Sequence, residues 1–167
     1  MNVQAWSPHL TPERAKEAGV AFATKEELFR TSDIISIHMV ASPSTFDLVA
    51  SNEFDLMKPT AFLINTSRGP IVNEEALLQA LNEERIAGAG LDVYNMEPLP
   101  LDSPIRSAKN VTLTPHMGYV GDTLYKVRTQ AHSRANLFRR DTVYRFSGKT
   151  LLRMSLHTST PTRKISS

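Results

Sequence analysis

The chain of 167 residues contains no cysteine. Disulfide bonds, thiolate metal sites and cysteine nucleophiles are therefore excluded, and a reducing compartment is permitted. No apolar run approaches the ~18 residues that a membrane span needs. The first residues, Met-Asn-Val-Gln-Ala-Trp, lack the charged and apolar regions of a secretory signal. We expect no membrane association, no metal site and a cytoplasmic location.

Glycine and proline are not abundant, with 7 and 10 residues, while 41% of the chain is hydrophobic and 22% is charged. These values are ordinary for a globular protein and exclude collagen-like and wholly disordered chains. The length fits one domain with its own core and leaves no room for two full domains.

Acidic residues are scarce in the C-terminal segment. Residues 121–167 carry 10 Lys and Arg against 2 Asp and Glu, whereas residues 1–120 carry 9 against 15. A basic segment could bind nucleic acid or a membrane surface through phosphate groups. This one has no interleaved aromatic residues and no nucleic-acid-binding motif, so we do not expect nucleic acid as a partner. We favour a solvated helix face followed by a basic, Ser/Thr-rich tail, disordered over residues 147–167.

Short apolar runs alternate with helical patterns through residues 1–120. The expected strands are Val3–Trp6, Ile34–Ile37, Ala61–Ile64, Ala89–Val93 and Val111–Leu113. The expected helices are Thr11–Ala18, Lys25–Phe29, Asn52–Met57 and Asn73–Leu81. Thr24 and Glu27 form a capping box ahead of the second helix. Continuous apolar strands joined by helices predict an α/β fold with an open, doubly wound parallel sheet.

Polar residues follow the expected strands directly. They are Ser7, His38, the run from Asn65 to Gly69, Asp92, and the run from Thr114 to His116. Ligands of open parallel sheets bind beyond the carboxyl ends of the strands. These residues are therefore the candidates for a functional site.

Three of these segments carry a family resemblance. Residues 65–72 (NTSRGPIV), 91–98 (LDVYNMEP) and 114–118 (TPHMG), together with residues 36–38 (SIH), resemble motifs of the D-isomer-specific 2-hydroxyacid dehydrogenases. The resemblance covers residues 1–120 and implies a dinucleotide-binding domain of the Rossmann type. It implies an oxidoreductase that interconverts a small D-2-hydroxy acid and a 2-keto acid with NAD or NADP, and it implies a homodimer.

The resemblance assigns three catalytic residues. Arg68 matches the arginine that binds the substrate carboxylate and carbonyl, and a guanidinium presents a planar fork of donors suited to that task. His116 matches the acid and base, because imidazole exchanges a proton near neutral pH. Glu97 matches the carboxylate that pairs with this histidine and holds its ring.

The resemblance also implies a cofactor site. The residues that match it or the loop beside it are Met39, Thr66, Ser67, Asp92 and Gly118. Asp92 corresponds to the acid near the nicotinamide carboxamide. Ser7 stands where the family commonly has an aspartate for the adenosine ribose, and loss of that acid permits NADP. His9 and Arg14 are the candidates for contact with a 2′-phosphate.

One motif of the family is missing. The sequence has no G-x-G-x-x-G turn, and Gly88-Ala89-Gly90 precedes a strand, so it is not in the strand-to-helix context that binds pyrophosphate. The chain is therefore expected to begin after the turn, and its sheet to lack the central first strand. We expect the isolated chain to be inactive. The alternative is a truncated, non-enzymatic binding or oligomerisation module that resembles a corepressor.

The segment after His116 departs further from the family. Residues 121–146 are expected to form a C-terminal helix, because they carry an apolar stripe at helical spacing: Leu124, Val127, Ala131, Ala135 and Phe138. This helix resembles the one that leads back to the family's substrate domain. An exposed apolar stripe favours self-association.

Overall fold

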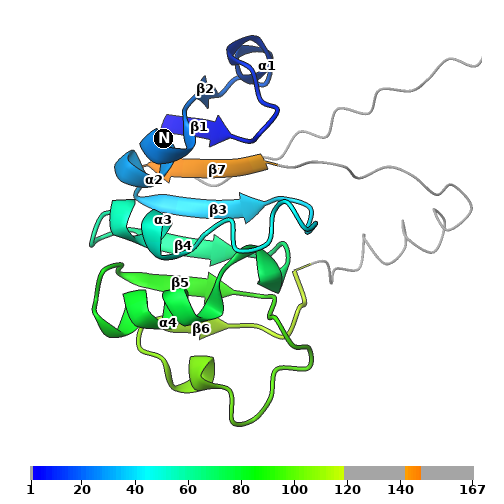
Figure 1. Cartoon of the computed structure of the whole chain (residues 1–167). Helices are drawn as coiled ribbons and strands as arrows, with labels where there is room; N and C mark the ends of the chain where they lie inside the picture. Colours follow the sequence, from blue (N-terminus) through cyan, green and yellow to red (C-terminus); the bar gives the residue numbers. More distant parts are fainter. Residues whose placement is uncertain (1, 119–141, 148–167) are drawn as a thin grey trace, which may run out of the picture.

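A computed structural model describes residues 2–118 and 142–147, which form one mixed seven-stranded sheet in the order β2-β1-β7-β3-β4-β5-β6 (Figure 1). The strands are β1 (Asn2–Trp6), β2 (Ala21–Phe22), β3 (Ile34–His38), β4 (Phe62–Asn65), β5 (Gly88–Leu91), β6 (Val111–Leu113) and β7 (Thr142–Ser147). The five strands expected from residues 1–120 are confirmed. The two-residue β2 was not predicted, because it is too short to show a periodic pattern.

Among the residues that the structure describes, four helices and two 3-10 turns connect the strands. They are α1 (Pro12–Glu17), α2 (Lys25–Thr31), α3 (Ser51–Leu56), α4 (Glu74–Asn82), η1 (Gly69–Ile71) and η2 (Pro104–Ser107). The predicted capping box of α2 is confirmed, since the Thr24 hydroxyl accepts the Glu27 amide and the Glu27 carboxylate accepts the Thr24 amide. Helix α4 begins in the same way at Asn73, whose side chain accepts the Ala76 amide at 2.9 Å.

The chain winds outward from the centre of the sheet in two directions. Strand β1 pairs with β2 in parallel on one side, and β3, β4, β5 and β6 pair in parallel on the other. This arrangement confirms the α/β class and the doubly wound order. All these strands therefore end at one edge of the sheet, where ligands of such folds bind.

The centre of the sheet differs from the prediction. Residues 142–146 were expected to end a helix and to leave the central position empty, but residues 142–147 form β7, antiparallel to both β1 and β3 (Figure 1). The physical reason is that β1 and β3 each present an unpaired edge, and a strand of β-branched and aromatic residues (TVYRFS) satisfies both. The rest of the predicted helix and tail lies outside the described residues.

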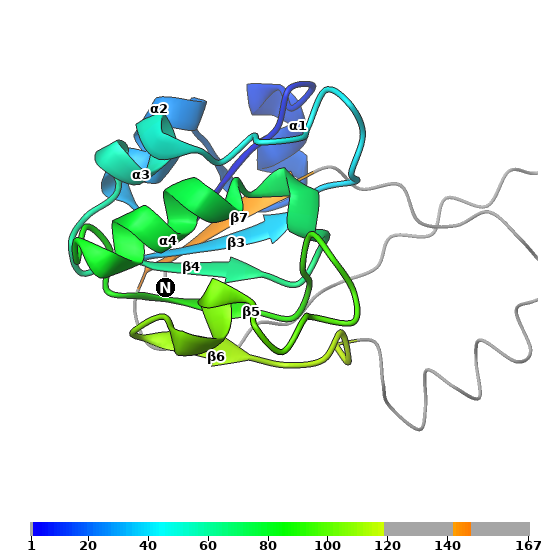
Figure 2. The ribbon, with the colours of Figure 1, turned by 60° about the horizontal axis from the view of Figure 1, so that its bottom comes forward.

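Helices α2, α3 and α4 lie along one face of the sheet, as Figure 2 shows. Their apolar sides pack on the inward residues of the strands, and the largest fully buried side chains include Phe29, Phe54, Leu77, Leu81, Ile35, Ile37 and Leu63. This core fixes the strands that carry the candidate loops. Within the described part of the chain, no helix is long and apolar enough to cross a membrane.

Candidate active site

The three family-like segments meet at the carboxyl ends of β4, β5 and β6. Two backbone hydrogen bonds tie the loops to their neighbours: the Asp92 amide donates to the Asn65 carbonyl at 2.9 Å, and the Thr114 amide donates to the Leu91 carbonyl at 2.9 Å. The parallel register of the strands is thereby continued into the loops. Residues far apart in the sequence are brought to one place.

The loop after β4 presents Arg68 to solvent. Asn65 is 1% exposed, and its side chain accepts the Ser67 amide at 3.0 Å and donates to the Arg68 carbonyl at 3.0 Å. The Ser67 hydroxyl donates to the Met39 carbonyl, which joins this loop to the end of β3. The Arg68 guanidinium donates to the Ser67 carbonyl at 2.6 Å. Asn65 therefore shapes the turn that carries the arginine.

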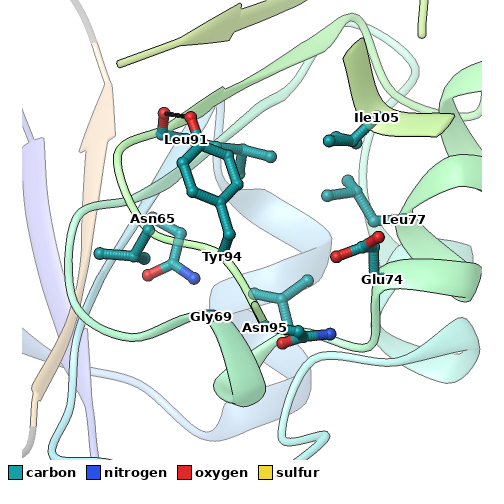
Figure 3. Close-up of a pocket in the computed structure, with 10 residues that line it drawn as sticks. Asn65, Gly69, Glu74, Leu77, Leu91, Tyr94, Asn95 and Ile105 are labelled. Atoms are coloured by element: carbon teal, nitrogen blue, oxygen red, sulfur yellow. Dashed lines mark hydrogen bonds between the residues drawn. The ribbon is translucent and has the colours of Figure 1, made fainter. Parts of the chain in front are cut away.

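Gly69 links this loop to the next. A Cβ atom at residue 69 would lie 2.1 Å from the Tyr94 carbonyl carbon and 2.5 Å from the Asn95 nitrogen, so only glycine fits beside this backbone. Figure 3 shows Gly69, Tyr94 and Asn95 around a small cavity of about 20 Å³. The arginine loop and the Glu97 loop are thus packed backbone against backbone.

His116 and Glu97 form the central pair. Nδ1 of His116 lies 2.6 Å from Oε2 of Glu97, and the two side chains are 32% and 35% exposed. Oε1 of Glu97 accepts the Tyr94 amide at 2.9 Å. Burial raises the pKa of Glu97, but the hydrogen bonds from His116 and Tyr94 and the positive charges of His116 and Arg68 outweigh it, so the pKa lies below its usual value. Glu97 is therefore ionised at neutral pH.

Asp92 holds the loop that carries His116. Its carboxylate is 4% exposed and accepts the Thr114 hydroxyl, the Met117 amide at 2.9 Å and the Gly118 amide at 2.7 Å. Burial raises the pKa of Asp92, but these three hydrogen bonds and the charge of His116 lower it by more. His116 itself has a φ of 52°, a left-handed conformation that is maintained only when its surroundings fix it.

The structure brings most of the predicted site residues together. Met39 and Ser67 are joined by their hydrogen bond, Thr66 is exposed beside them, and Asp92 contacts Gly118. Ser7 is not part of this group, because it follows β1 and the central strand β7 separates β1 from β3.

The candidate contacts for a 2′-phosphate lie together near Ser7. The Arg14 guanidinium donates to the His9 carbonyl at 3.0 Å, and the Ser7 carbonyl accepts the Leu10 amide at 3.1 Å. These bonds form a compact turn at the end of β1. His9 is therefore within the same loop as Ser7, and Arg14 reaches that loop from helix α1.

The sequence assigned no role to three residues of the site, although Asn65 and Thr114 lie in the candidate runs. Asn65 and Thr114 shape the loops, and Tyr94 joins them through a hydroxyl that donates to the Thr114 carbonyl at 2.7 Å. A buried Asn directly after a strand is a turn signal that could have identified Asn65. The Tyr94 contact spans 20 residues of sequence and has no local signal.

A cavity of about 670 Å³ opens beside the pair. Its lining residues are Tyr94, Glu97, Pro98, Leu99, Arg106, Leu113, Thr114, Pro115 and His116. This volume is in the range of sites for small molecules. The carboxylate of Glu97, the imidazole of His116 and the guanidinium of Arg106 around such a space can bind an anionic ligand and exchange a proton with it.

The residues fit only part of a dinucleotide. The polar loops after β3, β4, β5 and β6 supply donors and acceptors suited to a nicotinamide and its ribose. The phosphate end does not fit, because the sequence has no G-x-G-x-x-G turn. At the centre of the sheet, where such a turn would open, Thr142 of β7 pairs with His38.

Comparison with known proteins gives a consistent result. Residues 1–118 match the family described as D-isomer specific 2-hydroxyacid dehydrogenase, NAD binding domain. A Staphylococcus haemolyticus protein that carries the name 2-hydroxyacid dehydrogenase is 36% identical over 150 residues, which is 90% of this chain and 45% of that protein.

Solved structures show the same similarity. A structure named for D-3-phosphoglycerate dehydrogenase, from Ralstonia solanacearum, has a TM-score of 0.72 at 34% identity, over 80% of this chain and 41% of that one. A Lactobacillus jensenii D-lactate dehydrogenase with NAD⁺ has a TM-score of 0.68 at 28% identity, over 78% of this chain and 43% of that one. The chain thus spans less than half the length of each of these three proteins.

Proposed function

Because this chain belongs to the D-isomer-specific 2-hydroxyacid dehydrogenase family, through the NAD-binding domain that it matches over residues 1–118, we propose that it carries the catalytic residues of an NAD(P)-dependent oxidoreductase. The reaction interconverts a D-2-hydroxy acid and a 2-keto acid. The observation that supports this most directly is the 2.6 Å contact between His116 Nδ1 and Glu97 Oε2, next to the loop of Arg68.

Arg68 binds the substrate carboxylate. Its guanidinium is on an exposed loop and its charge reaches Glu97, so an anion bound there lies beside the His116–Glu97 pair. A planar fork of N–H donors matches a carboxylate and can also polarise the adjacent carbonyl. The substrate class is therefore a small acid with a keto or hydroxyl group on C2.

His116 transfers the proton. Glu97 engages Nδ1, and we assign to Nε2 the exchange of a proton with the oxygen on C2. A bound reduced nicotinamide would supply the hydride for C2, and His116 Nε2 would donate the proton to the oxygen on C2. In the reverse direction His116 would accept the hydroxyl proton, and the oxidised nicotinamide would take up the hydride. Glu97 stabilises the charged imidazole in both directions.

The cofactor is NAD or NADP, which supplies or accepts the hydride. Met39, Thr66, Ser67 and Asp92 would hold the nicotinamide end, and Gly118 binds the Asp92 carboxylate. Ser7 would lie at the adenosine end, where the loss of an acid permits a 2′-phosphate. Binding of NADH at least about tenfold tighter than NADPH, or roughly 1.4 kcal/mol, would contradict a role for NADP.

We expect the isolated chain to turn over no 2-keto acid, because the phosphate-binding turn is not in its sequence. The test is an NMR titration of the purified chain with glyoxylate, hydroxypyruvate and pyruvate. Shifts of the His116 ring signals that disappear in Arg68→Gln and persist in Arg85→Gln support the proposal. No shift in the unmodified chain, or equal shifts in Arg68→Gln, overturns it.

A turnover assay complements the titration. NADH or NADPH oxidation that His116→Ala abolishes would show that the chain is active alone, against our expectation, and would confirm the reaction. The homodimer and the cytoplasmic location that we propose by analogy with the family need separate tests, which are gel filtration of the purified chain and fractionation of cells.

A second function is favoured by a separate observation. Strand β7 occupies the centre of the sheet, so the described residues form one continuous sheet. The sequence has no phosphate-binding turn. Such a domain could act as a non-enzymatic binding or oligomerisation module. Quenching of Trp6, the single tryptophan, by NADH distinguishes the two. An oligomer that shows neither cofactor quenching nor 2-keto acid shifts favours the module.

A further inference from the structure

Tyr94 lies in the loop of Glu97 and contacts the loop of His116, without belonging to the proposed catalytic pair. It is 8% exposed and its ring packs in the core, three residues after the end of β5. Figure 3 shows the ring between Asn65 and Leu77, with its hydroxyl turned toward the Leu91 carbonyl. The residue also borders the larger cavity beside His116.

The backbone amide and the side-chain hydroxyl of Tyr94 donate hydrogen bonds to different partners. Its amide donates to Glu97 Oε1 at 2.9 Å, and its hydroxyl donates to the Thr114 carbonyl at 2.7 Å, with the Leu91 carbonyl at 3.2 Å. The Thr114 carbonyl also accepts the amide of His116 at 3.1 Å. One residue thus connects Glu97 directly and His116 through a single shared carbonyl.

We propose that Tyr94 is a positioning residue that sets the geometry of the Glu97–His116 pair from both sides. The inference rests on the proposed function, because that function gives the Glu97–His116 pair its catalytic role. His116 adopts a left-handed backbone conformation, which is costly unless the surrounding contacts fix it. Asp92 fixes the turn at Thr114, Met117 and Gly118, and Tyr94 fixes it at the Thr114 carbonyl.

The hydroxyl is suited to this task because it remains a donor. Burial raises the pKa of Tyr94, and the negative charge of Asp92 raises it further. The phenol is therefore neutral through the pH range in which a histidine exchanges protons. Its bond to Thr114 persists in both protonation states of His116.

Tyr94→Phe isolates the hydroxyl, since it keeps the ring and the backbone amide that holds Glu97. The measurement is ¹³C NMR of the Glu97 carboxyl and the His116 ring in the purified chain, as a function of pH. We expect the pKa of Glu97 to rise toward its usual value and the ring signals to broaden. The removed hydroxyl is uncharged, so such a shift reports the loss of the pair's geometry.

Thr45→Val is the matched control. The Thr45 hydroxyl is also buried and donates to a carbonyl, that of Val40 at 2.8 Å, but it does not touch the 94–118 segment. Both variants are expected to lower the unfolding temperature, while only Tyr94→Phe moves the Glu97 titration. An unchanged Glu97 titration in folded Tyr94→Phe overturns the proposal and leaves the hydroxyl a purely stabilising role.

An alkaline titration of the unmodified chain covers the case in which Tyr94→Phe does not fold. The His116 ring signals should change with the same midpoint as the Tyr94 Cζ signal, because ionisation removes the donor. Independent midpoints overturn the proposal. Neither measurement needs cofactor or turnover, so failure of the dehydrogenase reaction remains distinguishable from failure of the Tyr94 role.

Discussion

The Gly118 amide donates to Asp92 Oδ2 at 2.7 Å, and a Cβ atom on Gly118 would lie 2.9 Å from the same oxygen. The end of β5 and the loop after β6 are therefore in contact at a point that has no room for a side chain. Thr114, Met117 and Gly118, which flank His116, all donate to the Asp92 carboxylate. The conformation of the His116 turn therefore depends on this buried carboxylate.

Asp92→Asn is expected to destabilise the fold by about 2 kcal/mol, which is typical for hydrogen bonds to a charged group. An asparagine side chain has one oxygen, so it cannot accept from Thr114, Met117 and Gly118 as the two carboxylate oxygens do. Urea denaturation at pH 7 measures the loss. Equal stability of the two proteins would show that the three bonds are not formed.

The same substitution has a predicted pH dependence. The folded-state pKa of Asp92 is lowered, so its stabilising contribution is complete above the unfolded pKa of ~3.9 and is lost as the pH falls through the lower folded-state value. The difference in stability between the unmodified protein and the Asp92→Asn variant should therefore be constant near neutrality and shrink in acid. A difference that grows in acid would contradict the sign of this shift.

Gly69→Ala is expected to cost about 3 kcal/mol or more, because the added Cβ would lie 2.1 Å from backbone that cannot move alone. Gly90→Ala is the matched control, since its Cβ meets only the end of the Ile64 side chain at 3.0 Å. Thermal unfolding of both variants makes the comparison. Equal losses would mean that the Tyr94–Asn95 backbone does not pack on Gly69.

The sequence was sufficient to predict strands β3 to β6, which pair in parallel. Strands β3, β4 and β5 are mostly buried beyond their first residues, and buried parallel strands are continuous apolar runs. The motifs that follow them could be placed at one edge because parallel strands end together. Arg68 and His116 were therefore expected at the same edge from the strand order, whereas Glu97 was assigned through the resemblance to the family.

Strand β7 and the role of Tyr94 could not be predicted in this way. Residues 142–147 directly follow a segment with helical periodicity, and the unpaired edges of β1 and β3 that favour a strand are distant in the sequence. The Tyr94 hydroxyl bond depends on how two loops pack. In both cases the deciding contact is long-range, and a periodic pattern contains only short-range information.

Glu97→Gln is expected to change the stability by only about 0–1 kcal/mol, because a pair that is about one-third exposed is screened by water. Glutamine keeps an oxygen for the Tyr94 amide but removes the charge beside His116. The Glu97–His116 pair should therefore affect proton transfer by His116 more than it affects the free energy of unfolding. Urea denaturation tests this, with Asp92→Asn as the comparison that does destabilise, and a larger loss in Glu97→Gln would contradict it.

Tyr144→Pro tests whether β7 joins the two halves of the sheet. Residue 144 is paired with Ala5 of β1 and Ser36 of β3, so a proline there removes a backbone donor from the middle of the central strand. A ladder bond whose loss leaves a backbone partner unsatisfied costs about 1–3 kcal/mol. Beyond that loss, β1 and β2 are held to β3 mainly through β7 in the strand order.

We therefore expect a lower unfolding temperature and a second transition, in which the β1–β2 unit melts first. Thr150→Pro, just after the strand, is the control in circular dichroism melts. A single unshifted transition in Tyr144→Pro would mean that residues 142–147 do not hold the sheet together.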